Sequence, residues 1–173
     1  MVHSVELIFD DDTDAAIRQV WDELMAAGVR SQAGHRSPSN RPHVTLTVAE
    51  GMDSAVDTAL CPVLARLPLE CTIGAPMLFG GRAFTLVRLL VPSAELLALH
   101  GEVHRLCLPH MPNGVLPHAD PGHWTPHVTL ARRVPADQLP AAFAVASVTR
   151  DVRGHAVGLR HWDGDEKIEY PIS

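Results

Sequence analysis

Two histidine–threonine pairs give this 173-residue sequence its clearest chemical potential. One pentapeptide, Pro-His-Val-Thr-Leu, occurs twice with an offset of 84 residues (127 − 43), at residues 42–46 and 126–130. Its alternation and β-branched residues predict a strand, and side chains two apart on a strand point the same way. His43 therefore shares a face with Thr45, and His127 shares one with Thr129. The apolar residues of each copy point to the opposite face, where we expect a core.

If both copies face one cleft, two imidazoles and two hydroxyls surround a single point. That set suits phosphodiester cleavage. A neutral imidazole can take a proton from water or a sugar hydroxyl, and an imidazolium opposite can protonate the leaving oxygen. Threonine hydroxyls can donate to the phosphate oxygens on which charge builds. We therefore predict that His43 and His127 are catalytic, that Thr45 and Thr129 bind the substrate, and that no metal is required.

A single H-x-T sequence on a strand is common and carries little information, so the elements around the two copies matter. Each half reads as strand, helix, long loop, the His-Val-Thr-Leu strand, helix and strand. The first half predicts strands at 2–9, 43–48 and 69–73, and helices at 13–27 and 53–67, the latter broken near Pro62. The second predicts strands at 75–79, 83–91, 127–131, 148–153, 156–162 and 167–172, and helices from Ser93 to about 106 and at 135–146. An internal duplication explains the match. We expect one α+β domain, 1–173, with lobes of roughly 1–74 and 75–173 around the cleft.

Composition limits the partners. The apolar fraction of 46% allows a sizeable core, and the formal net charge is −6, from 14 basic and 20 acidic residues. This balance argues against a broad grip on duplex DNA, but it allows a short basic cleft for one or two phosphates. Three cysteines without a C-x-x-C pair favour a reducing cytosol. We find no signal peptide and no apolar run near the roughly 18 residues of a membrane span. The expectation is a cytoplasmic monomer that is independent of membranes.

The paired motifs resemble the H-x-[ST]-hydrophobic signature of the two-histidine (2H) phosphoesterase superfamily. That superfamily includes the bacterial 2′-5′ RNA ligases and the RNA 2′,3′-cyclic phosphodiesterases. The second motif, Trp-Thr-Pro-His-Val-Thr-Leu-Ala-Arg at residues 124–132, is similar to that branch, in which an Arg often follows. The first motif continues as Thr-Val-Ala-Glu rather than the Phe-Leu-Gly often seen there, which leaves the subfamily and the substrate open. The resemblance implies a bilobal fold with antiparallel sheets flanked by helices around a central cleft. It also implies opening of a 2′,3′-cyclic phosphate, in the RNA branch to a 2′-phosphate.

Three further residues are candidates for substrate binding. The resemblance favours Arg132 as a phosphate contact, whereas strict alternation from His127 favours Arg133 instead. Arg41 lies two residues before His43 and could share its face. Trp124 could stack on a base, or it could pack its loop against the body of the protein.

A metal-based alternative rests on His100 and His104, which are four residues apart on a predicted helix. The H-E-x-x-H pattern and an evident third ligand are both missing, so we read the pair as part of a solvated helix face. No cofactor and no metal are expected.

We predict a metal-independent phosphodiesterase that hydrolyses a 2′,3′-cyclic phosphate at an RNA end or on a small nucleotide. The alternative is a non-catalytic module that binds nucleotides or RNA ends on the same fold. Geometry separates these two hypotheses, because the enzyme makes a specific demand. Both imidazoles must point into one cleft, separated by about the width of a phosphate group.

Overall fold

Seven antiparallel strands and five α-helices form the fold, which a computed structural model describes over residues 1–173. The strands are β1 (His3–Phe9), β2 (His43–Ala49), β3 (Leu69–Phe79), β4 (Phe84–Leu90), β5 (His127–Val134), β6 (Val152–Asp163) and β7 (Ile168–Pro171). The α-helices are α1 (Asp11–Ala26), α2 (Ala55–Leu60), α3 (Ala94–Cys107), α4 (Leu139–Ala144) and α5 (Ala146–Thr149). Short 3-10 helices cover 32–34, 61–66, 108–110 and 136–138. The expected α+β class is confirmed, and no helix has the length and apolarity of a membrane span.

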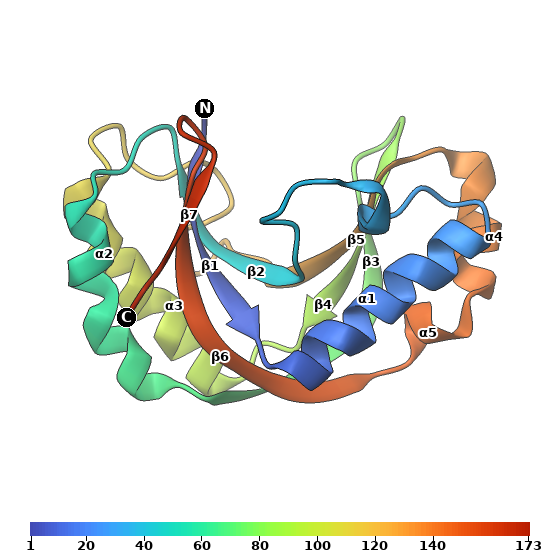
Figure 1. Ribbon diagram of the computed structural model, residues 1–173, viewed down its shortest axis with the longest axis horizontal. Coiled ribbons are helices and arrows are strands. Elements are labelled where there is room, and N and C mark those ends of the chain that lie inside the picture. The colour runs from blue at the N-terminus through green and yellow to red at the C-terminus, as the bar shows by residue number, and fades with distance from the viewer.

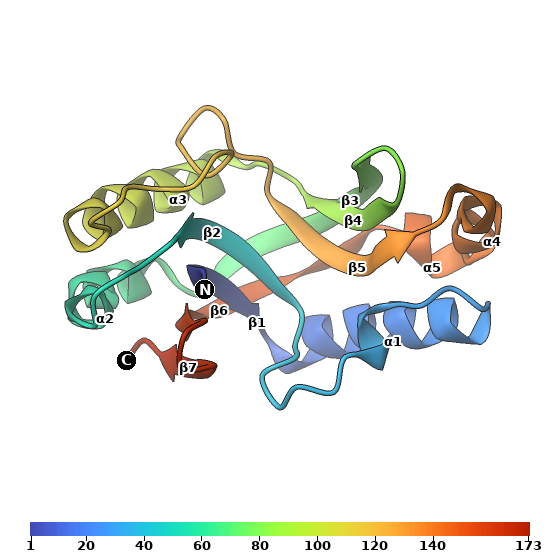
Figure 2. The same cartoon turned by 90° about the horizontal axis from the view of Figure 1, so that it is seen from above.

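The sheet runs in the order β1-β2-β5-β4-β3-β6-β7, and an additional β1–β6 pairing joins its two sides. The strands curve into a trough, with α2 and α3 at one end and α1, α4 and α5 at the other (Figure 1). The view from above shows the same separation, with β2 and β5 running between the two helical ends (Figure 2). A cluster of 34 buried apolar residues forms the core between the sheet and these helices.

The pairing supports an internal duplication. Strand β1 pairs with β2 as β4 pairs with β5, and Glu6 lies opposite Thr45 where Val87 lies opposite Thr129. One extra residue follows the threonine in both copies, so the same bulge recurs. Such a bulge turns the next side chains to the other face.

Two pairs of expected strands are single strands in the structure. Strand β3 runs through Gly74 with a register shift between Ile73 and Pro76, so it crosses the boundary expected near residue 74. Strand β6 runs through Gly154, where a Cβ would lie 1.9 Å from Oγ1 of Thr13. These glycines looked like strand ends in the sequence, but they allow a bulge and a close approach of α1.

The same two strands tie the halves of the chain together. Strand β6 pairs with both β1 and β3, and α1 contacts β5 and β6 of the second half. The first half therefore contributes elements to both ends of the trough. The stretch 148–151, expected to begin a strand, starts with Val148 buried in α5.

Side-chain caps fix the starts of the two long helices. Asp10 accepts a hydrogen bond from the backbone N–H of Thr13 (3.0 Å) at α1, and Ser93 accepts one from Leu96 (3.1 Å) at α3. Both caps satisfy N–H groups that the first turn leaves free.

The expectation of a solvated face at His100 is wrong. The side chain is 2% exposed, and its Nε2 lies 3.0 Å from the carbonyl oxygens of both Leu46 and Ala119. Helix α3 therefore buries this imidazole against β2, and the burial lowers its pKa. A four-residue spacing alone could not reveal which face of the helix is covered.

Candidate active site

One bridge between β2 and β5 organises the site. Val44 and Val128 pair across antiparallel strands, and both valines are 1% exposed. The antiparallel register sets His43 opposite Thr129 and Thr45 opposite His127. All four lie on the face opposite to the side chains of the two valines. Diagonal neighbours in such a ladder have Cα atoms about 7–8 Å apart, with the Cβ atoms somewhat closer. The register thus sets the four predicted residues at neighbouring positions on one face of the two strands.

The two imidazoles are held in the same way. Nδ1 of His43 lies 2.8 Å from the carbonyl oxygen of Arg41, and Nδ1 of His127 lies 2.7 Å from that of Thr125. A carbonyl can only accept, so Nδ1 carries the proton in both rings. In a neutral ring Nε2 then has a free lone pair. Each histidine is therefore oriented to take or give a proton through Nε2.

Two tryptophans hold the strands where they separate. The indole Nε1 of Trp21 donates to the carbonyl oxygen of Thr129 (3.1 Å), and that of Trp124 donates to the carbonyl oxygen of Thr45 (3.0 Å). A single bridge joins β2 and β5, so the strands supply few partners to each other there. Buried backbone carbonyls require partners, and the indoles provide them.

A cavity of about 720 Å³ opens beside His43. It is lined by 13 residues, drawn from β1, β2, β5, β6 and the loop before β2. Its ionisable side chains are one carboxylate, four guanidinium groups and two imidazoles: Glu6, Arg30, Arg132, Arg133, Arg160, His35 and His43. In a chain of net charge −6 this is a local excess of positive charge. Anions with more than one phosphate-like group fit such a surface.

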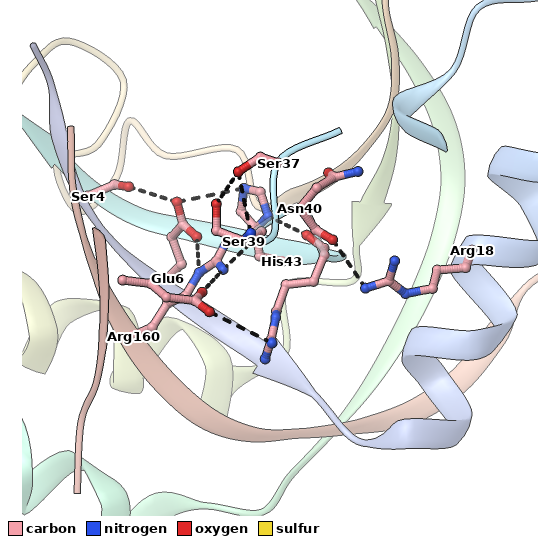
Figure 3. A network of polar contacts seen from close by, with 10 residues as sticks. Ser4, Glu6, Arg18, Ser37, Ser39, Asn40, His43 and Arg160 are labelled. Carbon is pink, nitrogen blue, oxygen red and sulfur yellow. Dashed lines mark hydrogen bonds and ion pairs between the residues drawn. The ribbon is translucent and has the colours of Figure 1, made fainter. Parts of the chain in front are cut away.

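A buried ion-pair network lies beside His43 (Figure 3). Nε of Arg160 donates to Glu6 at 2.7 Å, Ser4 donates to the same carboxylate at 2.7 Å, and both charged side chains are about 95% buried. Oε1 of Glu6 lies 3.7 Å from Nε2 of His43. Burial opposes ionisation of Glu6, but His43 and Arg160 outweigh it and hold its pKa below the ordinary value.

His127 has different neighbours. Phe79 meets its ring edge-on with centroids 4.9 Å apart, and Val87 occupies the position that Glu6 holds in the other copy. The pKa of His127 is lowered, and burial is the largest cause. The hydrogen bond to the Thr125 carbonyl opposes this shift, whereas the nearby side chains of Arg132 and His43 add to it. The neutral form is therefore favoured near neutral pH.

The comparison with protein families accounts for the paired motifs. A model described as the 2'-5' RNA ligase superfamily matches residues 9–166, which includes both of them. The chain belongs to this superfamily. The 2H phosphoesterase resemblance of the sequence is thereby confirmed. No curated protein sequence matches the chain.

Solved structures support the fold of this superfamily member. The protein TT0787 of Thermus thermophilus aligns over 100% of this chain and 96% of its own, with a TM-score of 0.60 and 14% identity. A protein described only as a phosphoesterase covers 98% of this chain and 92% of its own, with a TM-score of 0.51 and 13% identity. At these identities the likeness concerns the fold.

The structure brings both Arg132 and Arg133 to the cavity. Strand β5 gains an extra residue relative to β4 twice, once after Thr129 and once before Val134, and Arg133 has a φ of 56°. Strict alternation would place the two arginines on opposite faces of β5, and each bulge interrupts that alternation. Arg132 and Arg133, the two alternatives for the phosphate contact, therefore both line the cavity.

Arg41 and Trp124 do not line the cavity, and of the four motif residues only His43 does. A guanidinium nitrogen of Arg41 lies 3.8 Å from Glu169 on β7, while its backbone carbonyl orients His43. Trp124 stacks on His100 with ring centroids 3.9 Å apart, which is the packing alternative. A substrate contact by either side chain stays a prediction.

Proposed function

We propose that the protein is a phosphodiesterase that hydrolyses a 2′,3′-cyclic phosphate with His43 and His127 as its acid–base pair. One observation carries the proposal. Val44 pairs with Val128, so alternation along β2 and β5 sets the His and Thr of both motifs on one face. Membership of the 2'-5' RNA ligase superfamily supports the reaction class.

The unequal surroundings of the two histidines support a division of roles. His127, whose pKa is lowered, takes the proton of the attacking water through Nε2. His43, whose imidazolium would face Glu6 at 3.7 Å, gives its proton to the departing ribose oxygen. A new P–O bond to water forms as the bond to that ribose oxygen breaks. The product is a phosphomonoester, and proton exchange with solvent restores both rings.

The substrate is held by hydroxyls and guanidinium groups. Thr45 and Thr129 donate to the two non-bridging oxygens, where negative charge grows in the transition state. Arg132 and Arg133 line the adjoining cavity and bind further phosphates of an RNA end or a nucleotide. The net charge of −6 favours short substrates, because the negative surface outside this cavity would repel a long RNA backbone.

An activity panel tests the proposal. The protein is assayed in EDTA with 2′,3′-cyclic nucleotides, oligonucleotides ending in a cyclic phosphate, and 2′-5′ linked dinucleotides, and products are identified by ³¹P NMR. We expect hydrolysis of the cyclic phosphates. Tight binding of these compounds without turnover would instead support the non-catalytic alternative. Turnover that vanishes in EDTA and returns with zinc or manganese would contradict the metal-independent mechanism.

A further inference from the structure

Arg160 on β6 contacts both the carboxylate beside His43 and the loop that precedes it (Figure 3). Its side chain is buried, and its Nε donates to the carboxylate of Glu6 at 2.7 Å. Its Nη1 donates to the main-chain carbonyl of Ser39 at 2.9 Å and also to Glu169. A planar guanidinium group presents its donors in a fixed fork, so these acceptors together fix one orientation of the group.

The loop carries this contact to the ring of His43. The carbonyl of Arg41, two residues after Ser39, lies 2.8 Å from Nδ1 of His43. Only Pro42 separates Arg41 from His43. A proline ring fixes its own φ and restricts the backbone of the residue before it. The chain from 39 to 43 is therefore stiff, and holding the carbonyl of Ser39 also holds the carbonyl that orients the imidazole.

The second motif fixes the chain before its histidine in another way. The backbone N–H of Leu90 on β4 donates to the carbonyl of Pro126 at 3.0 Å, so the β4–β5 ladder extends one residue beyond His127. No backbone N–H donates to the carbonyl of Pro42. The chain before His43 thus relies on side chains for support that the strand ladder supplies at His127.

We propose that Arg160 is a positioning residue for His43. Through Ser39 it holds the carbonyl that binds Nδ1, and through Glu6 it holds the carboxylate that lies 3.7 Å from Nε2. One guanidinium group thereby acts on both nitrogens of one ring and keeps Nε2 aimed at the leaving oxygen. The catalytic part of this inference rests on the proposed role of His43 as the acid. The state of the ring in the free protein can be measured without that role.

¹⁵N NMR of the histidine rings in the free protein tests the positioning. At about pH 8.5, roughly two units above the ordinary histidine pKa, we expect His43 to be a single neutral tautomer with the proton on Nδ1. Arg160→Lys keeps a positive charge beside Glu6 but lacks the fork that also reaches Ser39. Once the carbonyl of Arg41 is no longer held, Glu6 favours a proton on Nε2, so both tautomers of His43 should appear.

Two controls separate this effect from a general loss of packing. His127 has its own contacts and should keep the proton on Nδ1 in Arg160→Lys. Arg88→Lys alters another buried arginine, which is 1% exposed and donates only to main-chain carbonyls, those of residues 73, 74, 147 and 150. We expect this variant to lose stability and to leave both imidazoles as they are in the wild type.

Kinetics with a 2′,3′-cyclic nucleotide separate positioning from a direct substrate contact, since Arg160 also lines the cavity. Arg160→Lys should lower kcat by roughly 10–10²-fold with little change in KM, the loss expected when a reacting group is misplaced by about 1 Å. A raised KM with an unchanged tautomer of His43 would overturn the proposal in favour of a substrate contact. Absence of turnover in the wild type would contradict the proposed function, and the NMR result would still decide the positioning.

The remaining outcomes are decided by NMR alone. A single Nδ1-protonated tautomer of His43 in Arg160→Lys, or the same change at His43 in Arg88→Lys, would overturn the proposal. The wild type provides a second measurement that does not depend on the folding of a variant. Its Arg160 guanidinium protons should exchange slowly with solvent, and rapid exchange or two tautomers of His43 would also overturn the proposal.

Discussion

The two H-x-T motifs have the same backbone arrangement and different neighbours. In both, a carbonyl two residues earlier holds Nδ1 of the histidine, and an indole N–H caps the carbonyl of the threonine. Glu6 and Arg160 stand beside the first motif. Val87 and Phe79 stand at the second.

This difference suits the proposed division of roles. The two motifs hold two imidazoles in one orientation, and the proposed hydrolysis needs one that starts neutral and one that starts protonated. Apolar packing and the positive charge of Arg132 favour the neutral form of His127. A buried carboxylate beside His43 can balance an imidazolium. The asymmetry that matters lies in the strands next to the motifs rather than in the motifs.

Removing either histidine should have the largest effect. His43→Ala and His127→Ala should each lower kcat by roughly 10²–10⁴-fold, the usual contribution of a positioned acid or base. The double variant should lose less than the product, since the pair acts as a unit. His155→Ala is the control, because His155 is half exposed on β6 and should leave kcat unchanged. Fully multiplicative losses would show that the two rings work independently.

The threonines should come next. Thr45→Val and Thr129→Val keep the side-chain shape and remove one donor each, so kcat should fall on the order of 10–10³-fold, by analogy with the loss of one oxyanion donor. Steady-state kinetics with a 2′,3′-cyclic nucleotide would measure this. Unchanged kcat in both variants would remove the hydroxyls from the mechanism.

The arginines should affect binding more than chemistry. Arg132→Ala or Arg133→Ala should raise KM by roughly 10–100-fold, since a hydrogen bond to a charged group contributes about 1.5–3 kcal/mol. Arg41→Ala is the matched comparison and should change KM little, because its guanidinium group faces Glu169. A larger KM change for Arg41 than for Arg132 and Arg133 would indicate that the further phosphates of the substrate bind near Arg41 instead.

Neutralising Glu6 should have the smallest effect on the maximal rate. In Glu6→Gln kcat should fall by less than about tenfold, because a neutral amide replaces the carboxylate that lies 3.7 Å from Nε2 of His43. Glu169→Gln also touches Arg160 but not His43, so its kcat should stay unchanged. Equal loss in both variants would point to a general disturbance of the Arg160 network.

The sequence predicted most of the elements because they depend on local order. Periodicity located the strands and long helices, and an identical pentapeptide at matching positions indicated the candidate site. The long strands β3 and β6 were divided because Gly74 and Gly154 resemble breaks. Only the tertiary contact with α1 shows why glycine is needed at position 154.

Other site residues depended on contacts distant in sequence. Glu6 lies on a strand that the sequence predicts, but its partner Arg160 is 154 residues away. An aligned repeat could have indicated Glu6, since it occupies the place of Val87. The bulges of β5 decided the access of Arg132 and Arg133, and strict alternation cannot anticipate a bulge. The contacts of Trp124 with Thr45 and His100 join positions that are distant in the sequence, so local order could not indicate them.

The division of roles is tested most directly by the pH dependence of kcat/KM in the two single histidine variants, measured with a 2′,3′-cyclic nucleotide. The wild type should give a bell for the coupled pair. Its acidic limb should lie below the ordinary histidine pKa of 6.5, because the pKa of His127 is lowered and the neutral base persists there. His127→Ala should retain the alkaline limb and lose the acidic one, and His43→Ala should do the reverse. Loss of the same limb in both variants, or an intact bell in either, would contradict the assignment of His127 as base and His43 as acid.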